Sequence, residues 1–295
     1  LNATAPINVS NLAGDISNIV GSGINVAPGT EGGQTFNKYK LAALDGGTVN
    51  IDTDINKADG PTTVSGYYFQ RFLGQRLKTN VNSNVTARLT TAQAHDLYKG
   101  QVVGIEANSS KNASNNTETQ VNVAAGKTID VARTDGTDKG GVGVFVNYGK
   151  VDNKGTIDVG GDQSVGILGM AYREDASHNP IVKEFGGKLG EGTVNITNEK
   201  DIKMSGKDAI GIYAMNNNTD TTVTSHLVTN KGTVEVGDSG EKTAVGIYAK
   251  NSIVGVAGDN LGNIDFNGAN GVGIYLKDNS TLLGNKVTLK QSATG

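Results

Sequence analysis

The sequence predicts an all-β protein, a right-handed parallel β-helix (β-solenoid), and three recurring features lead to this fold class. A short phrase, aliphatic–Gly–aliphatic followed by an aromatic residue or leucine, returns along the chain. A second phrase, apolar–charged–apolar, comes before most copies of the first, and an Asn precedes each copy of the second. The glycines of the first phrase are Gly143, Gly166, Gly211, Gly246 and Gly273, and the asparagines are Asn153, Asn198, Asn230 and Asn260.

Apolar residues alternate with other residues inside both phrases. Ile157 and Val159 flank Asp158, and Val245 and Ile247 flank Gly246. A period of two residues is typical of β-strands. Each repeat has room for three short strands, one in each phrase and one that ends at the Asn. A single coil cannot bury its apolar column alone, whereas coils stacked about 4.8 Å apart can.

The interval between neighbouring copies of the first phrase varies. It is 23 residues from Gly143 to Gly166 and 45 residues from Gly166 to Gly211. A basic coil with insertions explains this spread, and roughly ten to twelve coils would account for the length of the chain. A multi-blade antiparallel β protein is the competing interpretation, but irregular spacing and scarce Asn-Gly hairpin turns disfavour it. We expect the recurring Asn residues to form side-chain ladders at the bends.

The composition excludes several classes of protein. The 295 residues carry a net charge of −3, with acidic and basic residues interspersed. This balance argues against a nucleic-acid partner, which requires a basic surface. No apolar run has membrane-spanning length, and we expect no signal peptide at Leu1. The absence of Cys excludes a disulfide scaffold and suits a chain that crosses a periplasm and a narrow pore unfolded. We expect the chain to be an excerpt of something longer.

The chain divides into three predicted parts. Residues 1–66 are expected to form N-terminal β-helix coils with weaker phrases, and residues 99–295 are expected to form regular coils. Between them, residues 67–98 contain the densest aromatic and basic cluster, followed by a helix-like stretch from Thr90 to Tyr98 that Gly100 ends. We therefore predict a small inserted strand and helix subdomain over 67–98.

Long polar segments follow copies of the first phrase, at 106–120, 171–190 and 215–226. If the phrase is the same strand in every coil, these insertions leave from the same edge of the solenoid. Insertions gathered on one face of a solenoid usually mark the binding face. The sequence therefore predicts that specificity is held in these three loops and in the 67–98 insertion.

The chain resembles the passenger domains of large type Va autotransporter adhesins. The resemblance lies in both phrases, in the Asn at the bend and in the Cys-free, Gly- and Asn-rich rod, and the repeated sequences are most similar to those of the fusobacterial adhesins. The resemblance covers most of 99–295 and extends weakly over 1–66. It implies export through a C-terminal outer-membrane β-barrel and display on the bacterial cell surface. It also implies a role in adhesion and virulence, with host cell-surface receptors (immune-cell receptors among them), galactose-type glycans or other bacteria as partners. It supplies no motif from which a binding residue can be transferred.

Several fragments resemble enzyme motifs, but the repeats explain them more simply. The Gly-Asp-Ser-Gly stretch around Ser239 matches a serine-protease nucleophile motif, yet Gly237 and Asp238 fall at the same corner as Gly161 and Asp162. A polysaccharide-degrading β-helix enzyme would need convergent carboxylates. The acids at related strand positions favour a solvated face instead, and they are Asp52, Asp130, Asp158 and Asp265.

Metal and cofactor sites are not expected. The Gly-Gly-x-Gly-x-Asp rhythm of calcium-binding solenoids is absent. His95, His178 and His226 are far apart in sequence, which does not favour a shared metal site. The sequence thus predicts a non-catalytic protein without a cofactor.

Two groups of residues are candidates for partner binding. Tyr and Arg are enriched at interfaces, so we predict a site that draws on the aromatic and basic cluster and on the 171–190 loop; its residues are Tyr67, Tyr68, Phe69, Arg71, Phe72, Arg76, Tyr172, Arg173 and His178. The equal alternative is that the aromatic and basic cluster forms the internal core of the inserted subdomain. The other group is an outward column on one face, in which side chains stack from coil to coil; a role in stiffening the rod, or cover by the inserted loops, is favoured there over direct ligand contact. The column consists of Phe145, Leu168, Tyr213, Tyr248 and Tyr275.

The sequence therefore predicts the rod of a bacterial surface adhesin. Two alternatives stay open. In the first, the chain is a structural stalk whose binding head lies elsewhere. In the second, which is less favoured, it is a β-helix enzyme that degrades polysaccharides.

Overall fold

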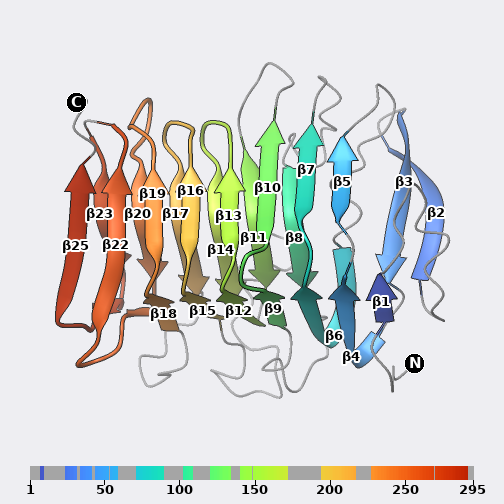
Figure 1. Ribbon diagram of the computed structural model, residues 1–295, viewed down its shortest axis with the longest axis horizontal. Helices are drawn as coiled ribbons and strands as arrows, with labels where there is room; N and C mark the ends of the chain where they lie inside the picture. The colour runs from blue at the N-terminus through green and yellow to red at the C-terminus, as the bar shows by residue number, and fades with distance from the viewer. Residues whose placement is uncertain are drawn as a thin grey trace.

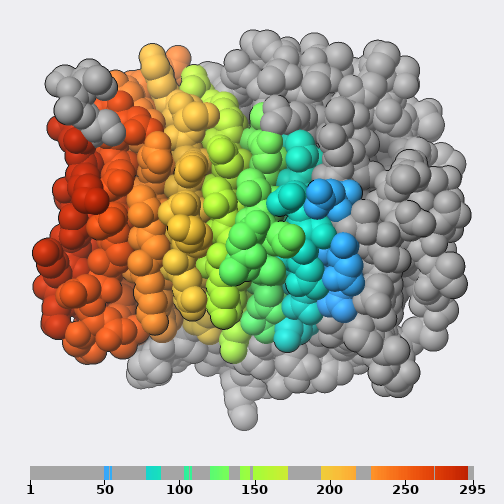
Figure 2. Space-filling view, viewed as in Figure 1, coloured from blue at the N-terminus to red at the C-terminus, as the bar shows by residue number. Residues whose placement is uncertain are grey.

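The computed structural model shows a right-handed parallel β-helix, as the repeats predict (Figure 1). It describes residues 7–9, 24–31, 34–41, 44–52, 54–58, 71–89, 102–108, 120–133, 140–147, 149–171, 194–216, 227–268 and 270–291. Every regular element within these ranges is a strand. Figure 2 shows the successive coils as adjacent bands of colour along the molecule.

Three parallel sheets run along the rod, and each coil contributes one strand to each sheet in turn. Sheet I contains β1 (Ile7–Val9), β4 (Leu44–Ile51), β6 (Arg71–Val81), β9 (Gln120–Val123), β12 (Gly149–Asn153), β15 (Val194–Asn198), β18 (Leu227–Asn230), β21 (Ile253–Val254) and β24 (Thr281–Leu282). Sheet II contains β5 (Ile55–Ala58), β7 (Val85–Leu89), β10 (Thr128–Arg133), β13 (Thr156–Val159), β16 (Asp201–Met204), β19 (Thr233–Val236), β22 (Asn260–Phe266) and β25 (Lys286–Gln291). Sheet III contains β8 (Val102–Asn108), β11 (Gly141–Asn147), β14 (Val165–Ala171), β17 (Ile210–Asn216), β20 (Val245–Lys250) and β23 (Val272–Lys277).

The long strand β6 joins sheets I and III at the N-terminal end of the rod. Its first residues pair with β8 of sheet III, and its last residues pair with β9 of sheet I. It also pairs with β4. Sheet II has 8 strands in the described part of the chain. Within the described residues, each sheet therefore has fewer strands than the ten to twelve coils expected.

Two of the predicted segment boundaries need correction. Residues 71–89 were expected to belong to an inserted subdomain, but β6 and β7 take regular places in the stack: β6 pairs with β4 and β7 pairs with β5 and β10. The apolar alternation of these strands lets them fill coil positions. Residues 67–70 and 90–98, the predicted helix included, lie outside the described residues. Within 1–66, β4 and β5 belong to the stack, whereas β2 (Ile24–Glu31) and β3 (Gln34–Leu41) form an antiparallel pair.

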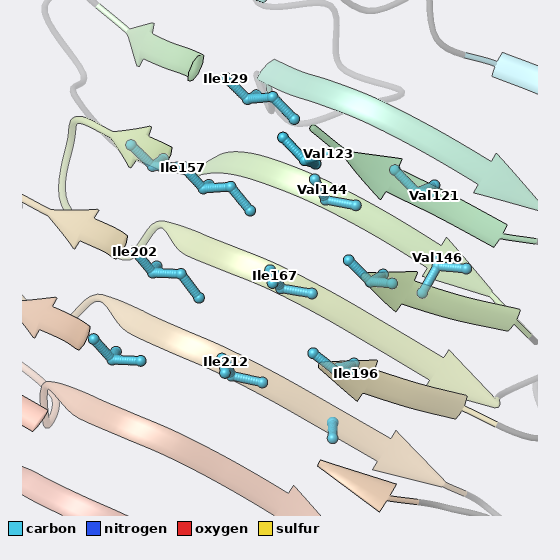
Figure 3. Close-up of a cluster of buried hydrophobic side chains, with 14 of the residues drawn as sticks. Val121, Val123, Ile129, Val144, Val146, Ile157, Ile167, Ile196, Ile202 and Ile212 are labelled. Carbon is cyan, nitrogen blue, oxygen red and sulfur yellow. The ribbon is translucent and has the colours of Figure 1, made fainter. Parts of the chain in front are cut away.

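Aliphatic columns fill the interior. Ile129, Ile157 and Ile202 lie one above the other on neighbouring strands of sheet II and are fully buried (Figure 3). Ile167 and Ile212 form the facing column in sheet III. Burying one such side chain contributes about 1.5–3 kcal/mol. Because every coil adds one member to each column, the stack gains stability coil by coil.

The glycine of the first phrase sits where sheet III passes closest to sheet II. A Cβ on Gly166 would lie 2.5 Å from the Ile202 side chain and 2.5 Å from the carbonyl oxygen of Gly211. Gly211 meets Val234 and the carbonyl oxygen of Gly246 in the same way. The recurring glycine is thus required by the close approach of two sheets, and these glycines lie in a single file as the sequence predicts.

Buried asparagines form a ladder at the bend between sheets I and II. The Asn153 side-chain amide donates to Asn198 Oδ1 at 2.7 Å, and the Asn198 amide donates to Asn230 Oδ1 at 2.7 Å. The predicted fourth member, Asn260, is exposed at the start of β22 and does not join. The turn after β21, with Gly255 and Gly258 at positive φ, displaces it. The Asn230 amide donates to backbone carbonyls instead.

One polar side chain interrupts an interior column. Thr79 is fully buried and pairs in register with Val49 and Val121, and its Oγ1 has no hydrogen-bond partner. A buried hydroxyl without a partner destabilises the native state. We expect Thr79→Val to raise the free energy of unfolding by about 1 kcal/mol, measured by urea denaturation. Thr86→Val, on the outward side of β7, is the control, and an equal gain there would contradict this explanation.

Candidate binding surface

The outward face of sheet III carries the predicted aromatic column. Phe145, Leu168, Tyr213, Tyr248 and Tyr275 pair in register from strand to strand. The ring centroids of Tyr213 and Tyr248 are 4.6 Å apart with the planes inclined by 10°, and those of Tyr248 and Tyr275 are 5.2 Å apart at 5°. The column is therefore stacked on one face, as the sequence predicts.

Inward residues of the same strand anchor this column. Val245, Ile247 and Ala249 are buried, so Tyr248 between them points outward. Burial raises the pKa of Tyr213, and the neighbouring Tyr248, through its charge and its hydrogen bond, raises this pKa further. The Tyr213 hydroxyl accordingly remains protonated and able to donate at physiological pH.

A second outward column runs beside the first and was not predicted. Met170, Met215, Lys250 and Lys277 follow each other in register. The Tyr213 hydroxyl donates to Met215 Sδ at 3.7 Å, and Lys250 Nζ lies 3.6 Å from an Asp278 carboxylate oxygen. The face of sheet III thus changes from apolar near β14 and β17 to cationic near β20 and β23. In the sequence, each member of this column comes two residues after a member of the aromatic column. It therefore continues the period-two alternation of the strand, and no separate motif marks it.

The insertions leave from the corner between sheets III and I, which we call the III–I corner. One residue, Tyr148, separates Asn147 from Gly149, but their register partners Met170 and Val194 are separated by 171–193. The neighbouring coil therefore closes the same corner without the extra residues. Relative to the register of the neighbouring coil, residues 172–193 are therefore an insertion.

The same comparison defines two further insertions at this corner. Two residues separate Lys250 from Ile253, whereas their partners Met215 and Leu227 are separated by 216–226. Likewise 109–119 separates β8 from β9, in the place of residues 148 and 149. The predicted departure from one edge is confirmed for all three segments. Their predicted bounds shift, because Asn108, Ala171 and Asn216 still belong to strands.

The predicted site residues fall largely outside the described residues. Arg71, Phe72 and Arg76 lie on β6, where Arg71 pairs in register with Glu106 of β8. Their position on a coil strand differs from the predicted inserted subdomain. The others lie outside the described residues, and they are Tyr67, Tyr68, Phe69, Tyr172, Arg173 and His178.

The corner between sheets II and III is closed by carboxylates that accept backbone N–H groups from the next coil. Asp162 Oδ1 accepts from the Lys207 N–H at 2.8 Å, and Asp238 Oδ1 accepts from the Asn270 N–H at 3.1 Å. The Ser239 hydroxyl donates to the Asn270 carbonyl at 2.9 Å and accepts from the Ala244 N–H at 3.0 Å. The expected repetition at this corner is present, and these hydrogen bonds give Ser239 a structural role.

Asp208 is the buried member of this corner series. Burial acts to raise the pKa of its carboxyl, but hydrogen bonds from the N–H groups of Gly240, Lys242 and Glu241 together outweigh it, so the pKa lies below its ordinary value of 3.8. Asp208 also has φ +57°, a left-handed conformation that Asp and Asn tolerate. The carboxylate therefore holds the corner in a conformation that an asparagine could share.

A pH-dependent loss of stability follows for Asp208. Because the folded pKa is depressed, the carboxylate stabilises the native state above about pH 4, the unfolded pKa, and this contribution is lost as the pH falls through the folded pKa. At pH 7, Asp208→Asn should lower the free energy of unfolding by about 1–2 kcal/mol. The difference between wild type and variant should shrink below pH 4 in denaturation curves recorded at several pH values. A difference that stays constant down to pH 2 would rule out the ionised carboxylate as the cause.

The outward face of sheet II carries mixed charges. Asp130 and Asp158 pair in register, and Asp158 pairs with Lys203 of the next strand. The column continues through Glu235 to Asp265, so related positions are confirmed for three of the predicted acids. Asp52 was predicted to lie at the equivalent position of the same column, and this prediction is wrong. Asp52 follows β4 in sheet I, and its Oδ1 accepts from the Asn82 amide.

Within the described ranges, no three or more His, Asp or Glu side chains are grouped in a way that could hold a metal ion. The same part of the chain contains no helix that is long and apolar enough to cross a membrane.

The fold and the III–I corner define a class of protein: a parallel β-helix scaffold that carries insertions along one edge. Comparison with protein-family models, with curated proteins and with solved structures gave no match.

Proposed function

We propose that this chain is the extracellular, non-catalytic rod of a bacterial surface adhesin, with its specificity in the insertions of the III–I corner. The observation that carries the proposal is the common departure line of the three insertions after β8, β14 and β17. Solenoids place variable, functional loops along one edge because the stacked strands tolerate extra residues only at corners. Neighbouring coils close this corner with one or two residues. The insertions are therefore not needed to close it, and we assign them a binding role.

The remaining parts of the proposal rest on the resemblance to autotransporter passenger domains. The partner is a host cell-surface receptor, a galactose-type glycan or another bacterium. The full-length protein is held at the outer membrane by a β-barrel. A rod without Cys supports this route, since it needs no oxidative folding before export.

The register dictates how the insertions can be removed. Deleting 172–193 joins Ala171 to Val194 and reproduces the direct connection of residue 148 to Gly149. Deleting 217–225 joins Asn216 to His226 and reproduces the connection of Asn251 to Ser252. Deleting 110–118 leaves two residues between β8 and β9.

We expect the triple deletion to keep its β circular dichroism and cooperative unfolding while it loses saturable attachment to host cells and to a glycan array. Lys203→Ala, on the face of sheet II, is the matched control and should attach as the wild type does. If the folded deletion variant attaches as strongly as the wild type, the insertions are not the site. If the intact fragment does not attach at all, it is a stalk and its binding head lies elsewhere.

A further inference from the structure

Three tyrosines on the outward face of sheet III are held in a geometry suited to covalent coupling. Tyr213, Tyr248 and Tyr275 belong to parallel strands in direct register, so their side chains extend in the same direction from equivalent positions. The ring planes are nearly parallel, at 10° and 5°. The rings of Tyr213 and Tyr248, like those of Tyr248 and Tyr275, are therefore stacked face to face.

We propose that this stack is an oxidative cross-linking site, at which hydrogen peroxide and a one-electron oxidant of the haem peroxidase class join neighbouring rings as dityrosine. Each phenol loses one electron and its hydroxyl proton to give a phenoxyl radical. Two radicals couple through the ring carbons next to the hydroxyl, forming one carbon–carbon bond. Both carbons then release their hydrogen as protons, the rings regain aromaticity and the oxygens are reprotonated. Two hydrogen atoms leave per link, and one peroxide is reduced to two waters.

The structure brings the reacting carbons near each other before any oxidation. The ring centroids are 4.6 Å and 5.2 Å apart, and rotation about χ2 of Tyr, which is a broad torsion, tilts two rings toward a shared bond. Tyr248 has two ortho carbons and lies between the other two rings, so it can be linked on both sides. Tyr275 is 47% exposed, so an oxidant in solution can reach the C-terminal ring of the stack.

Two features of the composition bear on such a link, the absence of Cys and the absence of Trp. The chain has no Cys, so a disulfide cannot tie one coil to the next, and a dityrosine would do so by constraining the unfolded chain. It also has no Trp, which leaves dityrosine emission unobscured. This inference does not depend on the proposed adhesin function.

The test oxidises the purified 295-residue protein with hydrogen peroxide and a haem peroxidase, and then maps the links by mass spectrometry. Cleavage after lysine separates the three tyrosines into peptides 208–231, 243–250 and 251–277. We expect blue dityrosine fluorescence and linked pairs of 208–231 with 243–250 and of 243–250 with 251–277, each short of two hydrogens. Monomers should retain these links at every protein concentration, and the oxidised protein should melt at a higher temperature.

Tyr248→Phe keeps the ring in the stack but removes the phenol, so both links should disappear while the circular dichroism is unchanged. Tyr275→Phe should lose only the second link. Links spread over all 9 tyrosines of the chain, links found only between chains, or undiminished fluorescence in Tyr248→Phe would each overturn the proposal.

Discussion

Asn198→Ala is expected to lower the free energy of unfolding by about 3–5 kcal/mol, because it leaves several buried polar groups without partners at once. The Asn198 side chain accepts from the Asn153 side-chain amide and donates to Asn230 Oδ1 and to the Lys200 backbone carbonyl. Asn153 is fully buried, and Asn230 is almost fully buried. Neither can turn to water when its partner is removed, so the loss exceeds that of one hydrogen bond.

The control for this prediction is a second Asn ladder on the outer face of sheet I. Asn122 donates to Asn80 Oδ1 at 2.8 Å, and Asn80 donates to Asn50 Oδ1 at 2.8 Å. These side chains are partly exposed, so water replaces a lost partner, and Asn122→Ala should cost only about 1 kcal/mol. Urea denaturation of the two variants measures the difference. Equal losses would mean that burial does not set the strength of the ladder.

Gly211→Ala is expected to lower the free energy of unfolding by about 3 kcal/mol, at the upper end of overpacking changes. The added Cβ would lie 2.1 Å from Val234 Cγ1 and 2.7 Å from the carbonyl oxygen of Gly246. Val234 is fully buried, and the carbonyl belongs to the strand of the next coil, so neither neighbour can move freely. The clash of the added Cβ with these two neighbours can then be relieved only if sheet III moves away from sheet II.

A double-mutant cycle distinguishes this explanation from a general sensitivity of the chain to glycine replacement. Val234→Ala removes the methyl groups that the new Cβ meets, so the double variant should be more stable than the sum of the single changes predicts. Gly160→Ala is the control, because its nearest neighbour would lie 3.6 Å away, and it should change stability by less than about 0.5 kcal/mol. An additive cycle would show that the contact with Val234 is not the cause.

The sequence predicts the stacking because the same residue types recur where the same forces act. Ile, Val and Gly return at one position of each phrase, since each coil must bury the same column and pass the same close approach. The Asn ladder follows from repetition for Asn153, Asn198 and Asn230. It fails for Asn260, because a longer turn with Gly255 and Gly258 at positive φ shifts that residue out of register.

Local composition misled the prediction for the N-terminal part. The aromatic and basic cluster around Arg71 and Phe72 differs from the later phrases, which indicated an insertion, but strand pairing between β4, β6 and β8 incorporates these residues into the stack. Pairing with neighbours on both sides outweighs what a short segment prefers alone. The antiparallel pair of β2 and β3 likewise has no counterpart in the phrases.

By itself the sequence determined the parallel solenoid, the file of glycines and the outward aromatic column, because each follows from a periodic pattern in which every coil repeats the last. Tertiary structure alone decided which residues are insertions, that the tyrosine rings stack face to face, and that Asn260 leaves the ladder. The physical reason is that register between coils is set by pairing of distant strands. A residue count along the chain does not reveal that Met170 and Val194 close the same corner as Asn147 and Gly149.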